Sequence, residues 1–295
     1  MLSKILGNYL VSKGKITSEQ LEDVLNEITK VRVKLGLIAV AEGMITQEQA
    51  DKINHLQTVM DKRFGDIAVI KGYLTEKQVD ELLKLQGNPY LAFAQALENL
   101  NLMNLAELEG MMKEYQVENE FSNSSMEDLK SDDIDRVLPL FLPSDAAEYL
   151  GVSGVALRLL MRCVDNNVMP MKAYFDKQFL ADKGAMQKVD GDQMITCAFA
   201  GKGQTLLPMA SYFGHEEFEE VNEDALDAVA ELINCINGLY AAEMSQKKVS
   251  LELCPPEFSS SINGFYSEKM LVLPLEVYGE TVQLLITVED KLEMR

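Results

Sequence analysis

The chain has 295 residues, enough for two ordinary domains, and carries 47 acidic residues against 27 lysines and arginines. The formal charge of −20 opposes the phosphate contacts that supply most nucleic-acid affinity, so the composition excludes a nucleic-acid partner. No apolar run reaches the roughly 18 residues of a membrane-spanning helix, and polar residues interrupt the N-terminus. We therefore expect no membrane insertion, no export signal and a cytoplasmic location.

Cysteine and histidine usage gives little support for a metal site. The four cysteines lie among apolar neighbours without a CxxC pair, which predicts buried free thiols: Cys163, Cys197, Cys235 and Cys254. The two histidines have no cysteine or histidine at ligand spacing. The sequence therefore predicts no metal site and no cofactor of the chain's own.

Residues 1–116 repeat with a period of 29 residues. Glycines recur at that spacing, and the fourth copy is degenerate: Gly7, Gly36, Gly65 and Ala94, then Gly14, Gly43, Gly72 and Asn101. Each copy also contains a capping residue followed three positions later by Gln or Glu, as in Thr17 and Gln20. These patterns predict an all-α module in which four helix pairs pack against one another.

Two of these copies, KLGLIAVAEGMITQEQADKINHLQ and RFGDIAVIKGYLTEKQVDELLKLQ, resemble the N-terminal domain of type II secretion ATPases, including its MshEN variant. Some MshEN domains bind cyclic di-GMP, and the resemblance implies Lys34, Gly36, Arg63 and Gly65 as nucleotide-binding residues. The sequence departs from the family's Arg-Leu-Gly start, with lysine at 34 and Phe64 in place of leucine. The alternative is a helical docking module whose apolar residues form only a core.

Residues 117–135, VENEFSNSSMEDLKSDDID, carry seven acidic side chains and one lysine. Such a composition buries too little apolar surface to fold by itself. We therefore predict an acidic linker between the helical module and a second domain at 136–295.

The second domain mixes helical and strand patterns, which predicts an α+β fold. Helical spacing covers 145–167, 205–214 and a long segment from about Glu223 to Glu243, whereas 193–201 has the pattern of a strand. Residues 269–290 are typical of two strands that turn at Tyr278, Gly279 and Glu280. We expect this hairpin to expose an edge strand through which two subunits could pair.

The long helix separates a core face from a polar face. Its core face contains seven residues about one turn apart: Leu226, Val229, Ala230, Ile233, Ile236, Asn237 and Tyr240. Asp227, Glu231, Asn234 and Gly238 lie on a different side, and Glu231 and Asn234, three residues apart, project together. Gly238 removes side-chain bulk beside the pair, which leaves room for a partner to approach.

The segment AELINCINGLYAAEMSQKKVSLELCPPEF and the residues before it resemble the chemotaxis phosphatase CheX and its CheC and FliY relatives. The signature of these proteins is Glu-x-x-Asn, which falls on Glu231 and Asn234. The earlier helix contains no second copy, so the resemblance implies one site, as in CheX.

This resemblance implies dephosphorylation of a phosphorylated CheY-like response regulator in two-component signalling. Asn234 would orient the attacking water by accepting from it, Glu231 would pair with the receiver's lysine, and Asp227 and Gly238 would contribute to docking. The receiver would supply the magnesium ion. The alternative from another class is a non-catalytic adaptor, or a cyclic di-GMP-responsive docking protein, in a chemotaxis, pilus or secretion assembly.

Overall fold

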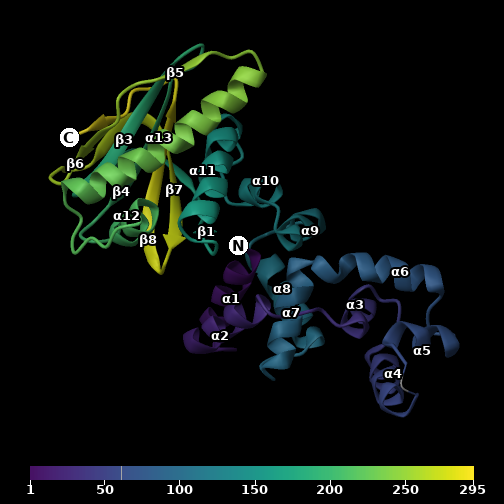
Figure 1. The fold of residues 1–295 in the computed structure, drawn as a ribbon. Helices are drawn as coiled ribbons and strands as arrows, with labels where there is room; N and C mark the ends of the chain where they lie inside the picture. The colour runs from purple at the N-terminus through teal and green to yellow at the C-terminus, as the bar shows by residue number, and fades with distance from the viewer. Residues whose placement is uncertain (61) are drawn as a thin grey trace. The chain divides into compact units, whose positions relative to one another are not determined.

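The computed structural model describes residues 1–60 and 62–295 (Figure 1). The chain divides into two compact units, Leu2–Asp132 and Asp133–Arg295, and Met1 belongs with the second. The first unit is helical and the second is built on an antiparallel sheet, so the predicted helix-rich N-terminal region and α+β C-terminal domain are confirmed. No helix in these described ranges has the length and apolar character needed to cross a membrane.

The N-terminal unit consists of short helices joined by tight turns. They are α1 (Leu2–Ser12), α2 (Ser18–Ile28), α3 (Leu35–Ala41), α4 (Gln47–Met60), α5 (Phe64–Ile70), α6 (Glu76–Lys84), the 3₁₀ turn η1 (Leu85–Gly87), α7 (Pro89–Asn99), α8 (Leu105–Glu118) and α9 (Asn123–Ser131).

Helices α2, α4, α6 and α8 begin at the predicted capping boxes. In each box the side chain of the cap residue accepts a hydrogen bond from the backbone N–H of the residue three positions later. The side chain of that later residue accepts from the backbone N–H of the cap residue. The pairs are Thr17 with Gln20, Thr46 with Gln49, Thr75 with Gln78, and Asn104 with Glu107. The turn before each helix contains a left-handed residue, Gly14, Gly43, Gly72 or Asn101, with φ between 53° and 70°. Glycine adopts this conformation without steric cost and asparagine tolerates it, so the four helices share one type of start.

The segment predicted as an unstructured linker, 117–135, is ordered instead. It contains the end of α8, all of α9 and the first residues of α10. Ser122 caps α9 by accepting from the N–H of Ser125, and the side chains of Met126 and Leu129, three residues apart, are buried. The prediction that this segment cannot fold is wrong, because the two apolar residues of α9 lie on one face of the helix, which packs against α7.

The C-terminal unit begins with short helical turns and continues as a mixed domain. Its helices are α10 (Ile134–Val137), η2 (Leu138–Leu140), η3 (Ala147–Tyr149), α11 (Leu150–Cys163), α12 (Leu207–Gly214) and α13 (Glu223–Gln246). Its strands are β1 (Met169–Pro170), β2 (Tyr174–Phe179), β3 (Lys183–Gly191), β4 (Ile195–Gly201), β5 (Leu251–Leu253), β6 (Glu257–Ser259), β7 (Phe265–Val277), β8 (Glu280–Val288) and β9 (Glu293–Met294).

The strands form one antiparallel sheet in the order β1-β7-β8-β4-β3-β5, with β2 and β9 also paired to β7 and β6 to β3. Helices α11, α12 and α13 cover one face and form the main core with it (Figure 1). On the opposite face a smaller cluster packs around Phe265, Leu285 and Leu292. This layering follows from strand alternation, since successive side chains point to opposite faces.

The predicted terminal hairpin is present, but it is not at an edge. Tyr278 and Gly279 turn the chain with positive φ angles of 49° and 82°, as a two-residue hairpin requires. Strand β8 pairs on its other side with β4, and β7 pairs with β1 and β2. The expectation of an exposed edge on this hairpin is therefore wrong, because non-local pairing covers both of its strands.

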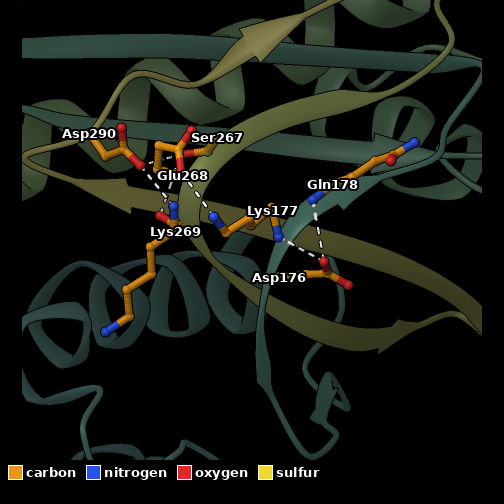
Figure 2. A network of polar contacts seen from close by, with 7 residues as sticks. All are labelled: Asp176, Lys177, Gln178, Ser267, Glu268, Lys269 and Asp290. Carbon is orange, nitrogen blue, oxygen red and sulfur yellow. Dashed lines mark hydrogen bonds and ion pairs between the residues drawn. The ribbon is translucent and has the colours of Figure 1, made fainter.

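Strand β2 lies at an edge of the described sheet, and three of its six residues, Asp176, Lys177 and Gln178, are polar (Figure 2). A bulge interrupts its pairing with β7 between Asp176 and Gln178. The carboxylate of Asp176 accepts from the backbone N–H of Lys177 at 2.7 Å, and the side chain of Lys177 reaches Glu268 on β7 at 3.0 Å. Charged side chains and a bulge are features that discourage edge-to-edge aggregation.

Truncation of Leu129 tests the folded state of the 117–135 segment. Leu129→Ala is expected to lower the free energy of unfolding of the N-terminal unit by about 2–4 kcal/mol, because it leaves a cavity beside α9. Urea denaturation followed by circular dichroism measures this loss in the full chain. The exposed Ser124→Ala change serves as control, and equal midpoints for the two variants would mean that α9 is not part of the folded unit.

Candidate functional site

The candidate site lies on α13, which starts at a strong helix signal. The side chain of Asn222 caps the helix by accepting from the N–H of Ala225 at 2.9 Å. Glu223 and Asp224 place negative charge in the first turn, where it interacts favourably with the helix dipole. Such a cap is worth about 1 kcal/mol, and it fixes where the helical register begins.

The apolar stripe of α13 is buried against the sheet and the other helices, and all seven predicted core residues are buried: Leu226, Val229, Ala230, Ile233, Ile236, Asn237 and Tyr240. Because these side chains anchor the helix, its rotation about its own axis is fixed. The side chains on the polar side of α13 therefore point in a fixed direction relative to the sheet.

Glu231 and Asn234 lie together on the accessible side of α13. Glu231 is exposed and Asn234 is half-buried. The Asn234 Nδ2 atom donates to Glu231 Oε2 over 3.4 Å, a long hydrogen bond that is readily exchanged for another partner. The structure thus brings the two predicted site residues into contact.

Asp227 and Gly238 extend this side of the helix by one turn in each direction. Asp227 is exposed and Gly238 is half-buried. A methyl group built onto Gly238 would have only Leu253 Cδ2 near it, at 4.0 Å. The surface beside Asn234 is therefore open at Gly238, as its sequence position predicts.

A buried amide cluster beneath Asn234 was not expected from the sequence. Gln187 on β3 is 1% exposed, and its Nε2 donates to Asn234 Oδ1 at 2.8 Å and to the Cys254 carbonyl at 2.9 Å. Its Oε1 accepts from Asn237 Nδ2 at 2.9 Å. The available signal was a glutamine between Ala185 and Val189, both of which point inward from the same strand.

Cysteine burial differs from the prediction, and one exposed cysteine borders the site. Cys197 is buried, Cys254 is half-buried, and Cys163 and Cys235 are exposed, so the expectation of four buried thiols is wrong. The cause is position, because Cys235 falls on the outward side of α13 next to Asn234. The pKa of the Cys235 thiol is nevertheless raised. The largest cause is partial desolvation of the thiol, followed by the charge of the nearby Glu231 carboxylate and by Cys163.

Glu231 and Asn234 lie on an accessible surface of α13. A hollow of about 620 Å³ lies on the opposite face of the sheet, between β3 residues Met186 and Lys188 and the C-terminal Met294, and neither Glu231 nor Asn234 lines it. Within residues 1–60 and 62–295, no cluster of histidine, cysteine and acidic side chains has an arrangement that could hold a metal ion. Because Glu231 is exposed and Asn234 is only half-buried, a group that a docked macromolecule brings can reach both side chains.

The four residues considered for nucleotide binding lie at the starts of α3 and α5. Lys34 and Arg63 precede these helices and are exposed. Gly36 and Gly65 are buried for a packing reason, because an added Cβ would lie 2.9 Å from the Phe64 ring and 2.8 Å from Val79 Cγ1, respectively. Gly36 thus allows α3 to approach the start of α5 closely, and Gly65 allows α5 to approach α6 closely.

Comparison with known protein families decides the nature of the C-terminal unit. Residues 184–268, which include α13 and both site residues, match the family described as chemotaxis phosphatase CheX. The C-terminal unit is CheX-like. A comparison with curated proteins finds no match.

Several solved structures resemble the CheX-like unit. A CheC-like superfamily protein from Shewanella sp. PV-4 has 18% identity and a TM-score of 0.42 over 47% of this chain and 95% of its own. CheX from Vibrio vulnificus has 15% identity and a TM-score of 0.42 over 48% and 100%. The CheX–CheY–BeF3–Mg complex from Borrelia burgdorferi has 18% identity and a TM-score of 0.34 over 47% and 95%.

The raised pKa of Cys235 gives a test of the local electrostatics. Because only the thiolate reacts, alkylation of Cys235 is expected to rise with a pH midpoint above the ordinary thiol value of 9.0. In Glu231→Gln the midpoint should fall, since one negative charge beside the thiolate is removed. Peptide mass spectrometry after iodoacetamide pulses measures both midpoints, and identical midpoints would contradict the electrostatic effect of Glu231 on the Cys235 thiol.

Proposed function

We propose that the CheX-like unit dephosphorylates the aspartyl phosphate of a CheY-like receiver domain. The observation that carries this proposal is the accessible pair of Glu231 and Asn234, in hydrogen-bond contact on a rigidly anchored helix within the CheX-matching segment. The pair is accessible to a macromolecule. It provides an amide that can position a water molecule and a carboxylate that can pair with a lysine of the receiver.

The reaction needs little chemistry from this chain. Water attacks the phosphorus of the aspartyl phosphate, the bond from phosphorus to the carboxyl oxygen breaks, and inorganic phosphate and the free receiver aspartate are released. The receiver's own magnesium ion and lysine stabilise the charge on the phosphoryl oxygens. The missing contribution is a positioned water, and Asn234 holds that water in line through its side-chain amide.

Glu231 acts in docking. Its exposed carboxylate forms an ion pair with the receiver's active-site lysine, a charge-assisted contact that sets the register of the two proteins. Its bond to Asn234 is long, so Glu231 can leave the amide when the lysine arrives. Asp227 and the open surface at Gly238 contribute to the same docking face.

A non-catalytic adaptor role is the alternative for this unit. The same helix would then be a platform on which another protein of the assembly docks without a reaction. Loss of receiver dephosphorylation on mutation of Asn234 separates the enzyme from the adaptor.

We also propose that the helix pairs of the N-terminal unit are copies of one MshEN-like unit that binds cyclic di-GMP. The supporting observation concerns the two MshEN-like segments, residues 34–57 and 63–86. The glutamine that ends each segment donates to the backbone carbonyl of the residue just before the other segment: Gln57 Nε2 to the Lys62 carbonyl at 3.4 Å, and Gln86 Nε2 to the Val33 carbonyl at 3.0 Å. Val33 and Lys62 precede the exposed Lys34 and Arg63, whose positive charges suit phosphates.

Removal of the Asn234 amide is expected to lower the maximal rate of receiver dephosphorylation by about 10- to 100-fold, because the attacking water is no longer positioned. The measurement is the decay of a phosphorylated CheY-like receiver at increasing concentrations of wild type or Asn234→Ala. Glu231→Gln should instead raise the half-saturating concentration, since it weakens docking.

The exposed neighbour Cys235→Ala is the matched control on the same helix and should retain the wild-type rate. If Asn234→Ala accelerates the decay as strongly as wild type does, α13 is not catalytic. The adaptor role then replaces the enzyme.

Calorimetry of the full chain tests the nucleotide proposal. Wild type is expected to release heat with cyclic di-GMP at tens of micromolar, and Lys34→Ala or Arg63→Ala should weaken binding about tenfold by removing a phosphate contact. Lys15→Ala, an exposed basic change outside both patterns, should bind normally. Absence of heat in wild type at these concentrations rules the sensor out.

A further inference from the structure

The buried amides of Gln187 and Asn237 lie directly beneath Asn234, where an apolar core would be the simpler arrangement. We infer that Gln187 is a positioning residue that holds the Asn234 amide with its nitrogen outward, as a hydrogen-bond donor to an oxygen atom at the reaction centre. This inference rests on the proposed phosphatase function and names the atom that Asn234 presents.

The orientation of Gln187 is set by a backbone carbonyl. The carbonyl oxygen of Cys254 lies 2.9 Å from the Gln187 side chain, and a carbonyl can only accept. The group that faces it must therefore be the Nε2 amide nitrogen of Gln187. The second hydrogen on this nitrogen points at Asn234, 2.8 Å away, so the facing atom of Asn234 must be its acceptor, Oδ1.

Asn237 fixes the other end of Gln187. Its Nδ2 atom faces two acceptors, Gln187 Oε1 at 2.9 Å and the Gln187 backbone carbonyl at 3.4 Å. The Asn237 Oδ1 atom is buried and has no hydrogen-bond partner among the described residues. Such an orphaned oxygen is destabilising, so the cluster is not the arrangement that stability alone would favour.

The hydrogen bonds from the Cys254 carbonyl through Gln187 to Asn234, called the relay below, determine which atom of the Asn234 amide faces a partner. With Oδ1 held inside by Gln187, Nδ2 faces the accessible side, where its hydrogen bond to Glu231 is long at 3.4 Å. When Glu231 turns to the receiver's lysine, Nδ2 is released to donate to an oxygen lone pair, that of the attacking water or of the phosphoryl group. The sequence-based expectation that Asn234 accepts from the water is replaced by donation.

Gln187→Glu is the sharpest test, because glutamate has nearly the same shape but is an acceptor when ionised. Asn234 then has to rotate its amide and donate inward, which turns Oδ1 outward. The maximal dephosphorylation rate is expected to fall about 10- to 100-fold, while the half-saturating receiver concentration stays within about twofold. Lowering the pH protonates the carboxyl, restores an inward donor, and should raise the variant's rate relative to wild type.

Two further variants separate positioning from a structural role. In an Asn234→Ala background, Gln187→Glu should cause no additional loss, since it acts through Asn234. Asn234→Asp keeps the inward acceptor but removes the outward donor, so it should lose the rate as Asn234→Ala does. The control Gln204→Glu adds the same charge at an exposed position of this unit and should leave the rate unchanged.

Side-chain amide exchange measured by NMR tests the relay independently of activity. The outward Asn234 N–H protons should exchange with water on the order of tenfold faster in wild type than in Gln187→Glu, where one of them is bonded inside. If wild type dephosphorylates no receiver, the proposed function fails and this exchange alone decides the role of Gln187. Unchanged exchange, or equal losses from Gln187→Glu with and without Asn234, overturns the inference.

Discussion

The packing of α13 against the sheet is the constraint on which the candidate site depends. Because its apolar stripe is buried, the helix cannot rotate without exposing core residues such as Ile233 and Ile236. Glu231 and Asn234 therefore keep one direction in space without any support from a loop. The proposed reaction, in which this pair meets a phosphoryl group on a docked receiver, would gain from this rigidity, since docking would require little further ordering.

Polar groups within that packed layer add a second level of order. An apolar interface would hold the helix equally well, but it would leave the amide of Asn234 free to turn. Gln187 and Asn237 instead connect the site to two backbone carbonyls, which cannot change their role as acceptors. The direction of a surface amide thus originates in the sheet beneath it.

The sequence contained enough information to predict the helix and its two faces, because helical phase is a local property. The capping boxes were predictable for the same reason. Strand β3 and its Gln187 were missed, since one polar residue in a short alternating pattern is difficult to distinguish from a surface position. The hairpin's neighbours and the folding of α9 depend on distant partners, and the charge of 117–135 concealed two apolar residues one turn apart.

If the inferred role of Gln187 and Asn237 is correct, the buried Asn237 oxygen, which has no donor among the described residues, sets stability against function. A buried acceptor without a donor makes the folded state less stable than it could be, by about 1–3 kcal/mol. Apolar replacements at Gln187 and Asn237 together would remove that oxygen, but they would also take the donor away from the Cys254 carbonyl and leave the Asn234 amide free to turn. A related protein with such replacements would still carry Glu231 and Asn234 on its surface, yet it would lack the amide orientation that we infer.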